Sequence, residues 1–281
     1  MFILLQKKEK NNPLAVEEEI IKQVIIQTRT EYLPAEYADM VHEGVPLKPT
    51  GFPKYWKDAV PIGSIEFVGT WLKIFHDRAM HPIEIPECLR RDEFLKREYR
   101  IVTADKIPRN GKWFVKDVSE LKSFNSNGVP DIQMINIDML AGKDYAQKYQ
   151  LEKQNNPFMF PPINPMHLFQ VSAIVPVEAE FRVYFINGEI VNICQYNGAY
   201  SMNLDIRLIE KANLIYSMTD SYPLSYTMDV MVSGNGTSII EIHPFACIGL
   251  YSTLWGNNLL RAYRHGIDYY IHHGSSLSAT E

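Results

Sequence analysis

The sequence predicts an α+β fold whose N-terminal part is α/β. Residues 1–90 contain a strand, a helix and a second strand, a pattern typical of a small α/β unit. Further along, β-branched and aromatic runs flank the turn sequences Asn187-Gly188 and Gly234-Asn235-Gly236, which predicts two β-hairpins. An amphipathic helix over residues 206–218 is predicted between the hairpins.

The N-terminal elements are predicted from apolar spacing and from proline. Residues 2–6 form an apolar run that predicts a strand, and an apolar stripe ending at Ile25 predicts a helix that starts near Pro13. Residues 34–53 contain four prolines and are predicted to be loop rather than regular structure. Residues 59–68 predict a short strand and a turn, which lead into a helix.

The remaining elements are predicted from local patterns in the same way. Further strands are expected over residues 113–118 and 169–177. Further helices are expected over residues 93–99, 141–153 and 257–265.

The composition is that of an ordinary soluble globular protein. Hydrophobic residues make up 46% and charged residues 22% of the 281 residues, and no apolar run approaches the roughly 20 residues that span a bilayer. The net charge of −5 argues against a general nucleic-acid-binding surface. Three widely spaced cysteines without a CxxC pair favour a reducing compartment. We therefore expect a cytoplasmic protein that binds neither membranes nor nucleic acids in general.

Five charged or titratable residues interrupt the apolar strands of the two hairpins. Side chains alternate along a strand with a period of two, so Glu180 and Arg182 share one face, and Glu241 and His243 share another. Asp229 lies on the neighbouring strand across the second turn. A buried charge is costly unless it is paired or bound. The carboxylates of Asp229 and Glu241 and the imidazole of His243 therefore indicate a Mg²⁺ site, and Arg182 indicates a phosphate site.

Two lysines add positive charge that suits a phosphate site. Lys116 lies in the middle of an apolar strand, and Lys122 follows in the next segment. Their ammonium groups could hold nucleotide phosphates as point charges. Phosphoryl transfer depends on such positioned cations and on Mg²⁺, so a phosphoryl-transfer site accounts for the lysines, the arginine and the carboxylates together.

Each of these residues also has a structural interpretation. Lys116 taken alone most simply points into solvent, and Arg182 taken alone would form an ion pair with Glu180. The two acidic hairpin residues would be surface charges, and His243 would be a structural histidine.

Several common catalytic motifs are missing from the sequence. It contains no GxSxG, HExxH, Rossmann GxGxxG or Walker Gly-Lys-Ser/Thr motif. These absences argue against the common hydrolase, dehydrogenase and P-loop classes.

The segments that carry the charged residues resemble, in this order, the ATP-grasp superfamily. They are WFVKDV at 113–118, LKSF at 121–124, EFRVYFING at 180–188, DV at 229–230 and IEIHP at 240–244. The resemblance is greatest to the clade named for one arginine and two lysines, many of whose members come from phages and bacteria. The acid-x-Arg strand is also similar to that of the ligases that add glutamate to ribosomal protein. The resemblance extends over about residues 60–260.

The resemblance implies an ATP-grasp fold, in which two α+β subdomains hold a nucleotide after an N-terminal pre-ATP-grasp domain. Residues 1–90 would then form the pre-ATP-grasp domain and residues 91–281 the ATP-grasp domain. Within the latter, 91–168 would be the N-terminal subdomain and 169–281 the C-terminal subdomain.

The resemblance also implies a role for each candidate residue. ATP would be held by Lys116, Lys122, Glu180 and the linker residues Gln170, Ser172 and Ile174. Arg182, with Lys116, would act in catalysis by stabilising the transferring γ-phosphoryl group. The Mg²⁺ ligands would be Asp229, Glu241 and His243. The family usually has Asn at the place of the histidine, and an imidazole is a poorer Mg²⁺ ligand than a carbonyl oxygen, which puts a second metal ion in doubt.

The activity implied by the resemblance is that of a carboxylate–amine ligase. A substrate carboxylate would attack ATP to give an acylphosphate and ADP, and an amine would then displace phosphate to leave an amide. The substrates would be a carboxylate and an amine, each a small molecule or a peptide. Tyr196, Tyr200 and Arg207 follow the first hairpin and would form a wall of the acceptor site. A homodimer is the default expectation for the assembly, and a phage-encoded member would work in the host cytoplasm.

Two other functions remain open from the sequence. A covalent nucleotidyltransferase of the RNA-ligase type would use Lys116 as the adenylated residue, although the Lys116-Asp-Val-Ser segment lacks the glycine expected near that lysine. A non-catalytic ATP-grasp module would bind nucleotide and a protein partner, and His243 is the residue that favours this interpretation.

Overall fold

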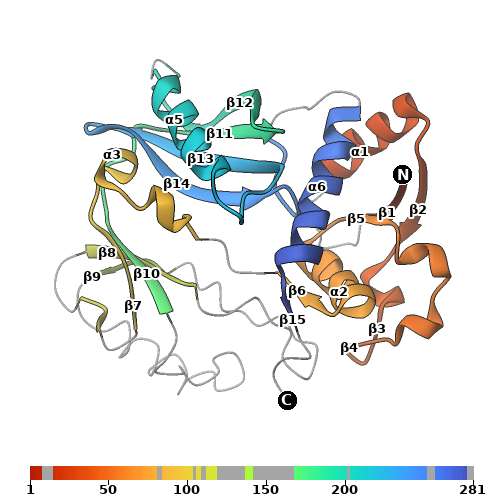
Figure 1. The fold of residues 1–281 in the computed structure, drawn as a ribbon. Helices are drawn as coiled ribbons and strands as arrows, with labels where there is room; N and C mark the ends of the chain where they lie inside the picture. Colours follow the sequence, from red (N-terminus) through yellow and green to blue (C-terminus); the bar gives the residue numbers. More distant parts are fainter. Residues whose placement is uncertain are drawn as a thin grey trace.

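The computed structural model describes residues 1–7, 15–80, 84–103, 106–108, 112–118, 137–141, 168–200, 203–251 and 257–276. Within these ranges the chain forms a parallel sheet near the N-terminus and two four-stranded antiparallel sheets, with helices beside them (Figure 1). The predicted α+β class with an α/β N-terminal part is confirmed.

The N-terminal sheet has three parallel strands in the order β2-β1-β5. Its elements in chain order are β1 (Phe2–Gln6), α1 (Ala15–Thr28), β2 (Glu31–Ala35), β5 (Val60–Ile62) and α2 (Ile65–His76). The hydroxyl of Ser64 caps α2 by accepting a hydrogen bond from the N–H of Phe67 at 3.3 Å. The predicted strand–helix–strand unit is confirmed.

Strand β2 begins just before the proline-rich segment and extends into it, so the prediction of loop is wrong at its start. Pro34 lacks the N–H that a central strand would need, but β2 is an edge strand, where proline is tolerated. Only short elements follow: η1 (Tyr37–Asp39), β3 (Val41–His42), β4 (Val45–Pro46), η2 (Pro49–Gly51) and η3 (Lys54–Trp56).

The second sheet is antiparallel and has the order β7-β10-β8-β9. Its strands are β7 (Tyr99–Thr103), β8 (Lys112–Asp117), β9 (Ile137–Ala141) and β10 (Leu168–Ala173). The predicted strand over 113–118 is confirmed, whereas the one over 169–177 is confirmed only in its first part. Short elements before this sheet are β6 (Arg78–Ala79) and η4 (Glu87–Leu89).

Of two helices predicted near the second sheet, the one over 93–99 is confirmed only in its first three residues, and the one over 141–153 is wrong at the residue that the structure describes. The helix α3 (Asp92–Leu95) ends after four residues because Lys96 adopts a left-handed conformation with φ of 48°, and β7 follows soon after. Ala141, the predicted start of another helix, ends β9, and the rest of that helix lies outside the described residues.

The third sheet contains both predicted hairpins and has the antiparallel order β12-β11-β13-β14. Its strands are β11 (Ala179–Ile186), β12 (Glu189–Gly198), β13 (Ser225–Ser233) and β14 (Gly236–Pro244). Asn187 and Gly188 both have positive φ, at 51° and 82°, as a tight two-residue hairpin turn requires. The helix predicted between the hairpins is α5 (Ile206–Ser217), capped by the side chain of Asp205.

A β-bulge changes the register of the second hairpin. Val230 lies opposite Ile239, but Asp229 lies opposite Glu241, so Ile240 is the extra residue. The side chains of Ile239 and Ile242 both lie in the same buried cluster. The two flanking isoleucines therefore face the core, and Glu241 faces the same side as Asp229.

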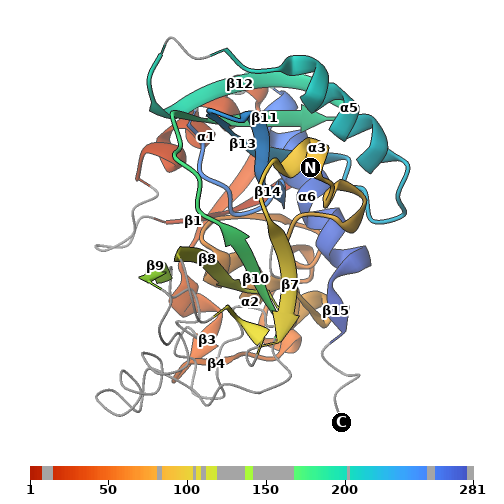
Figure 2. The same cartoon turned by 90° about the vertical axis from the view of Figure 1, so that its left-hand side faces the viewer.

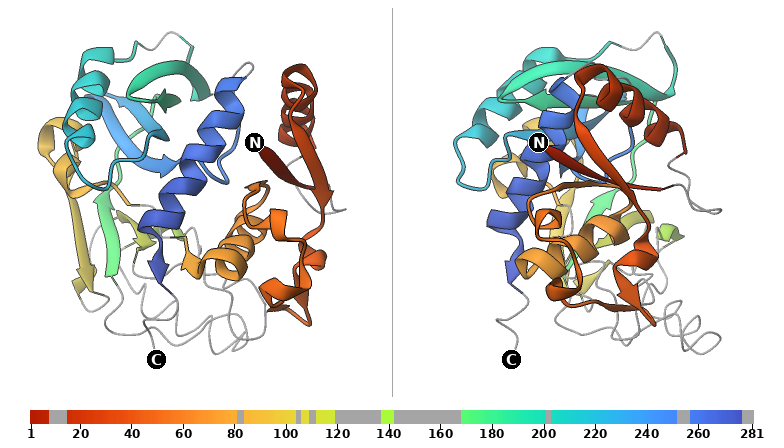
Figure 3. Two further views of the ribbon diagram at one scale, coloured as in Figure 1. Left: turned by 45° about the vertical axis from the view of Figure 1, so that its right-hand side comes forward. Right: turned by 90° about the vertical axis from the view of Figure 1, so that its right-hand side faces the viewer.

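The last helix joins the N-terminal sheet to the third sheet. It is α6 (Asn257–His273), longer than the predicted 257–265, and β15 (Ser275–Ser276) follows it and pairs with β6. Figures 1 and 3 show it between the two sheets, and it contacts α1, α2 and β5 as well as β13. One buried cluster accordingly contains Trp71, Phe245 and Leu259. The division into domains at residue 90 stays a prediction.

Gly266 allows α6 to approach the end of β14 closely, and this contact gives a prediction of stability. A Cβ atom at Gly266 would lie 2.1 Å from the carbonyl oxygen of Phe245. We expect Gly266→Ala to lower the free energy of unfolding by about 1–3 kcal/mol, because backbone would have to shift to relieve the overlap. Urea denaturation measures the change. Gly51→Ala is the matched control, since a Cβ there meets nothing within 4 Å. Equal stability of the two variants would contradict the prediction.

A separate observation concerns membranes. Among the described residues, no helix has both the length and the apolar character that crossing a bilayer would require.

Candidate active site

The third sheet lines up three of the candidate residues across neighbouring strands. Arg182 on β11 lies opposite Asp229 on β13, and Asp229 lies opposite Glu241 on β14. Directly opposed residues in an antiparallel pair point to the same face. His243 follows two residues after Glu241 on that face. The two hairpins thus present one arginine, two carboxylates and one imidazole together.

Arg182 and Asp229 form a buried ion pair with two hydrogen bonds. The Nε and Nη2 atoms of Arg182 donate to Oδ1 and Oδ2 of Asp229, each at 2.7 Å, and the side chains are only 8% and 4% exposed. Burial by itself would lower the pKa of Arg182, but the hydrogen bonds and charge of Asp229 raise it overall. Arg182 therefore stays charged, and the two hydrogen bonds hold it in one fixed geometry against Asp229.

Glu180 is not the partner of the arginine in this ion pair. It lies two residues before Arg182 on β11, and its Oε2 accepts a hydrogen bond from the Asn197 side chain at 3.2 Å. The structural interpretation in which Arg182 pairs with Glu180 is wrong, because the register between β11 and β13 brings Asp229 opposite the arginine.

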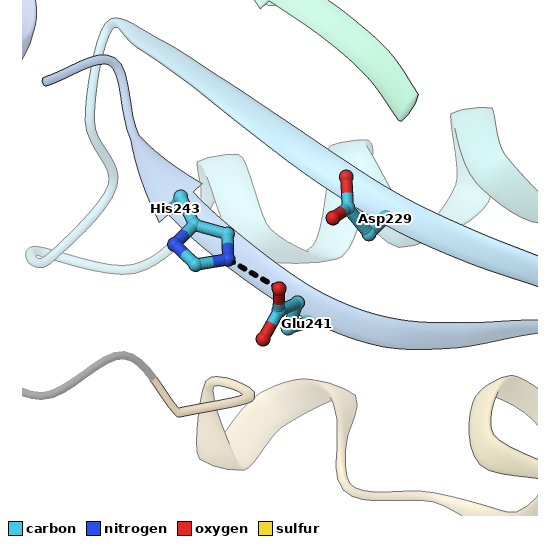
Figure 4. A group of neighbouring side chains, drawn as sticks. All are labelled: Asp229, Glu241 and His243. Atoms are coloured by element: carbon cyan, nitrogen blue, oxygen red, sulfur yellow. Dashed lines mark ion pairs between the residues drawn. The ribbon is translucent and has the colours of Figure 1, made fainter. Parts of the chain in front are cut away.

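Asp229, Glu241 and His243 form the group that suits a metal ion. Each offers one ligand atom, and these atoms all lie within 4.8 Å of one another. Figure 4 shows the aspartate on β13 and the other two on β14, with the imidazole Nε2 2.7 Å from Oε1 of Glu241. Asp229 is buried, whereas Glu241 and His243 are partly buried.

The chemistry of this group fits a divalent cation. The Nε2 atom of His243 is buried and lies close to the Glu241 carboxylate, but it makes no well-aligned hydrogen bond with any described residue, which leaves it available as a ligand. The carboxylates of Asp229 and Glu241 are the oxygen donors that Mg²⁺ prefers, while an imidazole also suits transition metals. The two hydrogen bonds from Arg182 occupy only part of what the two oxygens of Asp229 can accept.

Of the residues expected to hold the nucleotide, Lys116, Gln170 and Ser172 lie in the second sheet, a different part of the fold from β11, which carries Glu180 (Figures 1 and 2). Gln170 and Ser172 are buried in β10, which is paired on both sides, and Ile174 is exposed just beyond the end of that strand. The backbone of Lys116 on β8 lies opposite Gln170, but its side chain is not among the described residues. Lys122 lies outside the described residues. Their roles toward ATP stay predictions.

Tyr251 is a residue of the site that sequence reasoning missed. Its ring lies against the guanidinium of Arg182, with 4.7 Å from Cζ to the ring centroid, and stacks on Tyr196 at 4.6 Å. Tyr251 lies in a loop after β14, where neither periodicity nor charge marks it. The other two residues expected at the acceptor wall, Tyr200 and Arg207, are exposed, and their role stays a prediction.

The comparisons with known proteins agree with this architecture. Residues 94–257, more than half of the chain, match the model of an ATP-grasp domain family, the second family of the clade named for one arginine and two lysines. The fold is thus that of an ATP-grasp protein, and the chain belongs to that second family of the clade. The resemblance seen in the sequence is confirmed, including the clade.

The chain is also similar to solved structures with which it shares little sequence identity. The D-cycloserine synthetase DcsG superposes with a TM-score of 0.52 at 8% identity, over 95% of this chain and 99% of that chain. The D-alanine–D-alanine ligase from Bacillus anthracis complexed with ATP gives a TM-score of 0.43 at 13% identity, over 99% and 97%. No curated protein matches the chain in a sequence search.

Proposed function

We propose that the protein is an ATP- and Mg²⁺-dependent carboxylate–amine ligase that works through an acylphosphate and releases ADP and phosphate. The observation that carries the proposal is the row of Arg182, Asp229 and Glu241 across β11, β13 and β14, next to His243, in a chain of the ATP-grasp family. A cation and a divalent metal site side by side suit the transfer of a phosphoryl group.

In the first step a substrate carboxylate attacks the γ-phosphorus of ATP. Arg182 would stabilise the negative charge that spreads over the transferring group, and its buried pairing with Asp229 keeps it oriented for this task. Asp229, Glu241 and His243 would hold Mg²⁺, which when bound neutralises charge on the phosphate oxygens. Lys116 and Lys122 would bind the phosphates as further positive charges.

In the second step an amine attacks the acylphosphate carbonyl, and phosphate leaves as the amide forms. Enclosure of the site would protect the acylphosphate from water. Tyr196 lies beside the charged row, and burial together with the charges of Asp229 and Glu180 raises its pKa, so its hydroxyl stays protonated and can donate a hydrogen bond.

The proposed ligase activity is tested by measuring what the protein does with ATP. The purified full chain is incubated with Mg²⁺, ATP and pools of carboxylic acids and amines, and release of ADP that requires both pools supports the ligase. A protein adduct labelled from α-labelled ATP would instead support the nucleotidyltransferase that uses Lys116. Failure to bind ATP in the presence of Mg²⁺ would refute both activities.

One observation favours a second candidate, a nucleotide-binding module without catalysis. Arg182 is already engaged by Asp229 and by the carbonyl oxygen of Gly249, and an imidazole stands where the family usually has an amide. ATP binding without turnover in the native chain and in His243→Asn would support this module over the ligase.

The variant His243→Asn tests the proposed cation site by replacing one ligand atom, an imidazole nitrogen, with an amide oxygen. We expect the Mg²⁺ concentration at half-maximal turnover to fall by about 2–10-fold, because an amide oxygen suits Mg²⁺ better than an imidazole nitrogen does. Titration of turnover with Mg²⁺ measures this value. His42→Asn is the control, since His42 lies in β3 of the N-terminal part. A half-maximal Mg²⁺ concentration that is higher in His243→Asn than in the native chain would contradict the prediction.

A further inference from the structure

The guanidinium of Arg182 is held by three hydrogen bonds and by one aromatic ring. Nε and Nη2 bind Asp229, and Nη1 donates to the carbonyl oxygen of Gly249 at 2.8 Å. The ring of Tyr251 covers the guanidinium at 4.7 Å from Cζ. The arginine is therefore fixed in plane by three hydrogen bonds and covered by an aromatic ring, an arrangement that cation–π attraction stabilises.

Tyr251 is itself held in place by the strands of the first hairpin. Its N–H donates to the hydroxyl oxygen of Tyr184 at 3.1 Å, and the thiol of Cys194 donates to its carbonyl oxygen at 3.0 Å. Its ring stacks on Tyr196 with 24° between the ring planes. These three partners and Tyr251 are called the aromatic clamp below.

The clamp belongs to the same face of the sheet as the candidate active site. Tyr184 follows Arg182 by two residues on β11, and Cys194 lies opposite Arg182 on β12. Tyr184 and Cys194 therefore share the face that carries Arg182. Tyr196 is the extra residue of a β-bulge on β12, and it joins the clamp through the stacking of its ring on Tyr251. Tyr251 itself contributes no charge and no metal ligand, so its part in the proposed chemistry is through the arginine that its ring covers.

We propose that Tyr251 is a positioning residue for Arg182, and that the aromatic clamp sets the orientation in which the guanidinium meets the transferring phosphoryl group. The proposal rests on the proposed ligase function for its catalytic consequence, but the orienting contact can be tested without turnover. Tyr251 is 50% exposed, so substituting it leaves the buried core intact. Its ring excludes water from the arginine, and loss of the ring would let the guanidinium hydrate and sample other rotamers.

The first measurement observes the arginine directly. In the ¹⁵N-labelled full chain, the Nε–Hε signal of Arg182 is assigned by its disappearance in Arg182→Lys, and its exchange with solvent is measured. We expect Tyr251→Ala to speed this exchange by about tenfold or more, because without the ring the Arg182 side chain would open more readily to solvent. Tyr251→Phe keeps the ring and should keep slow exchange, and Tyr251→Leu, which is apolar but has no aromatic face, should lie between them.

The second measurement separates positioning from binding. We expect Tyr251→Ala to lower kcat by about 10–100-fold while the KM for ATP changes by less than about twofold, because a misplaced cation weakens the transition state more than the ground state. Tyr251→Phe should retain kcat. Tyr32→Ala is the control, since Tyr32 is 41% exposed on the edge strand β2.

The two measurements distinguish failure of the clamp from failure of the proposed function. Slow exchange of the Arg182 Hε in Tyr251→Ala overturns the clamp, whatever the activity. Fast exchange in that variant supports the clamp even where no form of the protein turns over, a result that would refute only the ligase. Fast exchange together with an unchanged kcat overturns the positioning role.

Discussion

Replacing Arg182 with alanine is expected to abolish most activity and to destabilise the fold. The variant leaves Asp229 buried without its partner, a change that costs about 3–5 kcal/mol for a buried ion pair. It also removes the cation proposed to act on the γ-phosphoryl group, so turnover should fall by about 10²–10³-fold. Chemical denaturation and steady-state kinetics measure the two effects.

Two comparisons make this expectation specific. Arg264→Ala removes an arginine from a similar pair with Asp268 on the surface of α6, where the loss should stay within about 1 kcal/mol. A double variant, Arg182→Met with Asp229→Leu, leaves no unpaired charge and should recover part of the stability lost in Arg182→Ala. If Arg182→Ala had the same free energy of unfolding as the native protein, Asp229 would have found another partner, and the argument would be refuted.

Replacing Glu241 with glutamine is expected to weaken the divalent cation site. The substitution keeps the size of the side chain but removes one of the two carboxylates of the group, so the affinity for Mg²⁺ should fall by about tenfold or more. Mn²⁺ can stand in for Mg²⁺, and its binding to the protein without nucleotide is measured by electron paramagnetic resonance. Turnover, measured separately, should require correspondingly more Mg²⁺.

The control for this substitution is Glu210→Gln on the exposed side of α5. It removes the same charge from the protein, so it corrects for the general loss of attraction to cations. If the two variants bound Mn²⁺ equally well, the three-residue group on β13 and β14 would not be a metal site.

The sequence predicts the third sheet well because its signals are local. The Asn187-Gly188 turn and the alternation along each strand act within a few residues. These signals predicted that Glu241 and His243 would share a face and that Asp229 would lie on the neighbouring strand, and the structure has both features.

What the sequence did not predict depends on contacts between distant segments. The pairing of Arg182 with Asp229 joins residues 47 positions apart and is set by the register of β11 on β13. Tyr251 reaches Arg182 from a loop, and β2 exists because β1 offers it an edge. Local sequence patterns do not show which distant residues will come together, so the ion pair, the Tyr251 contact and strand β2 were set by tertiary contacts.

The bulge at Ile240 also bears on how the residues of the candidate cation site are held in register. A slip of β14 by one residue would carry Glu241 to the opposite face and would draw Ile239 or Ile242, both almost fully buried, out of the core. Apolar packing therefore resists any other alignment of these ligands. An incoming ion meets donors that folding has already assembled, so the organisation of the site does not have to be driven by the binding event itself.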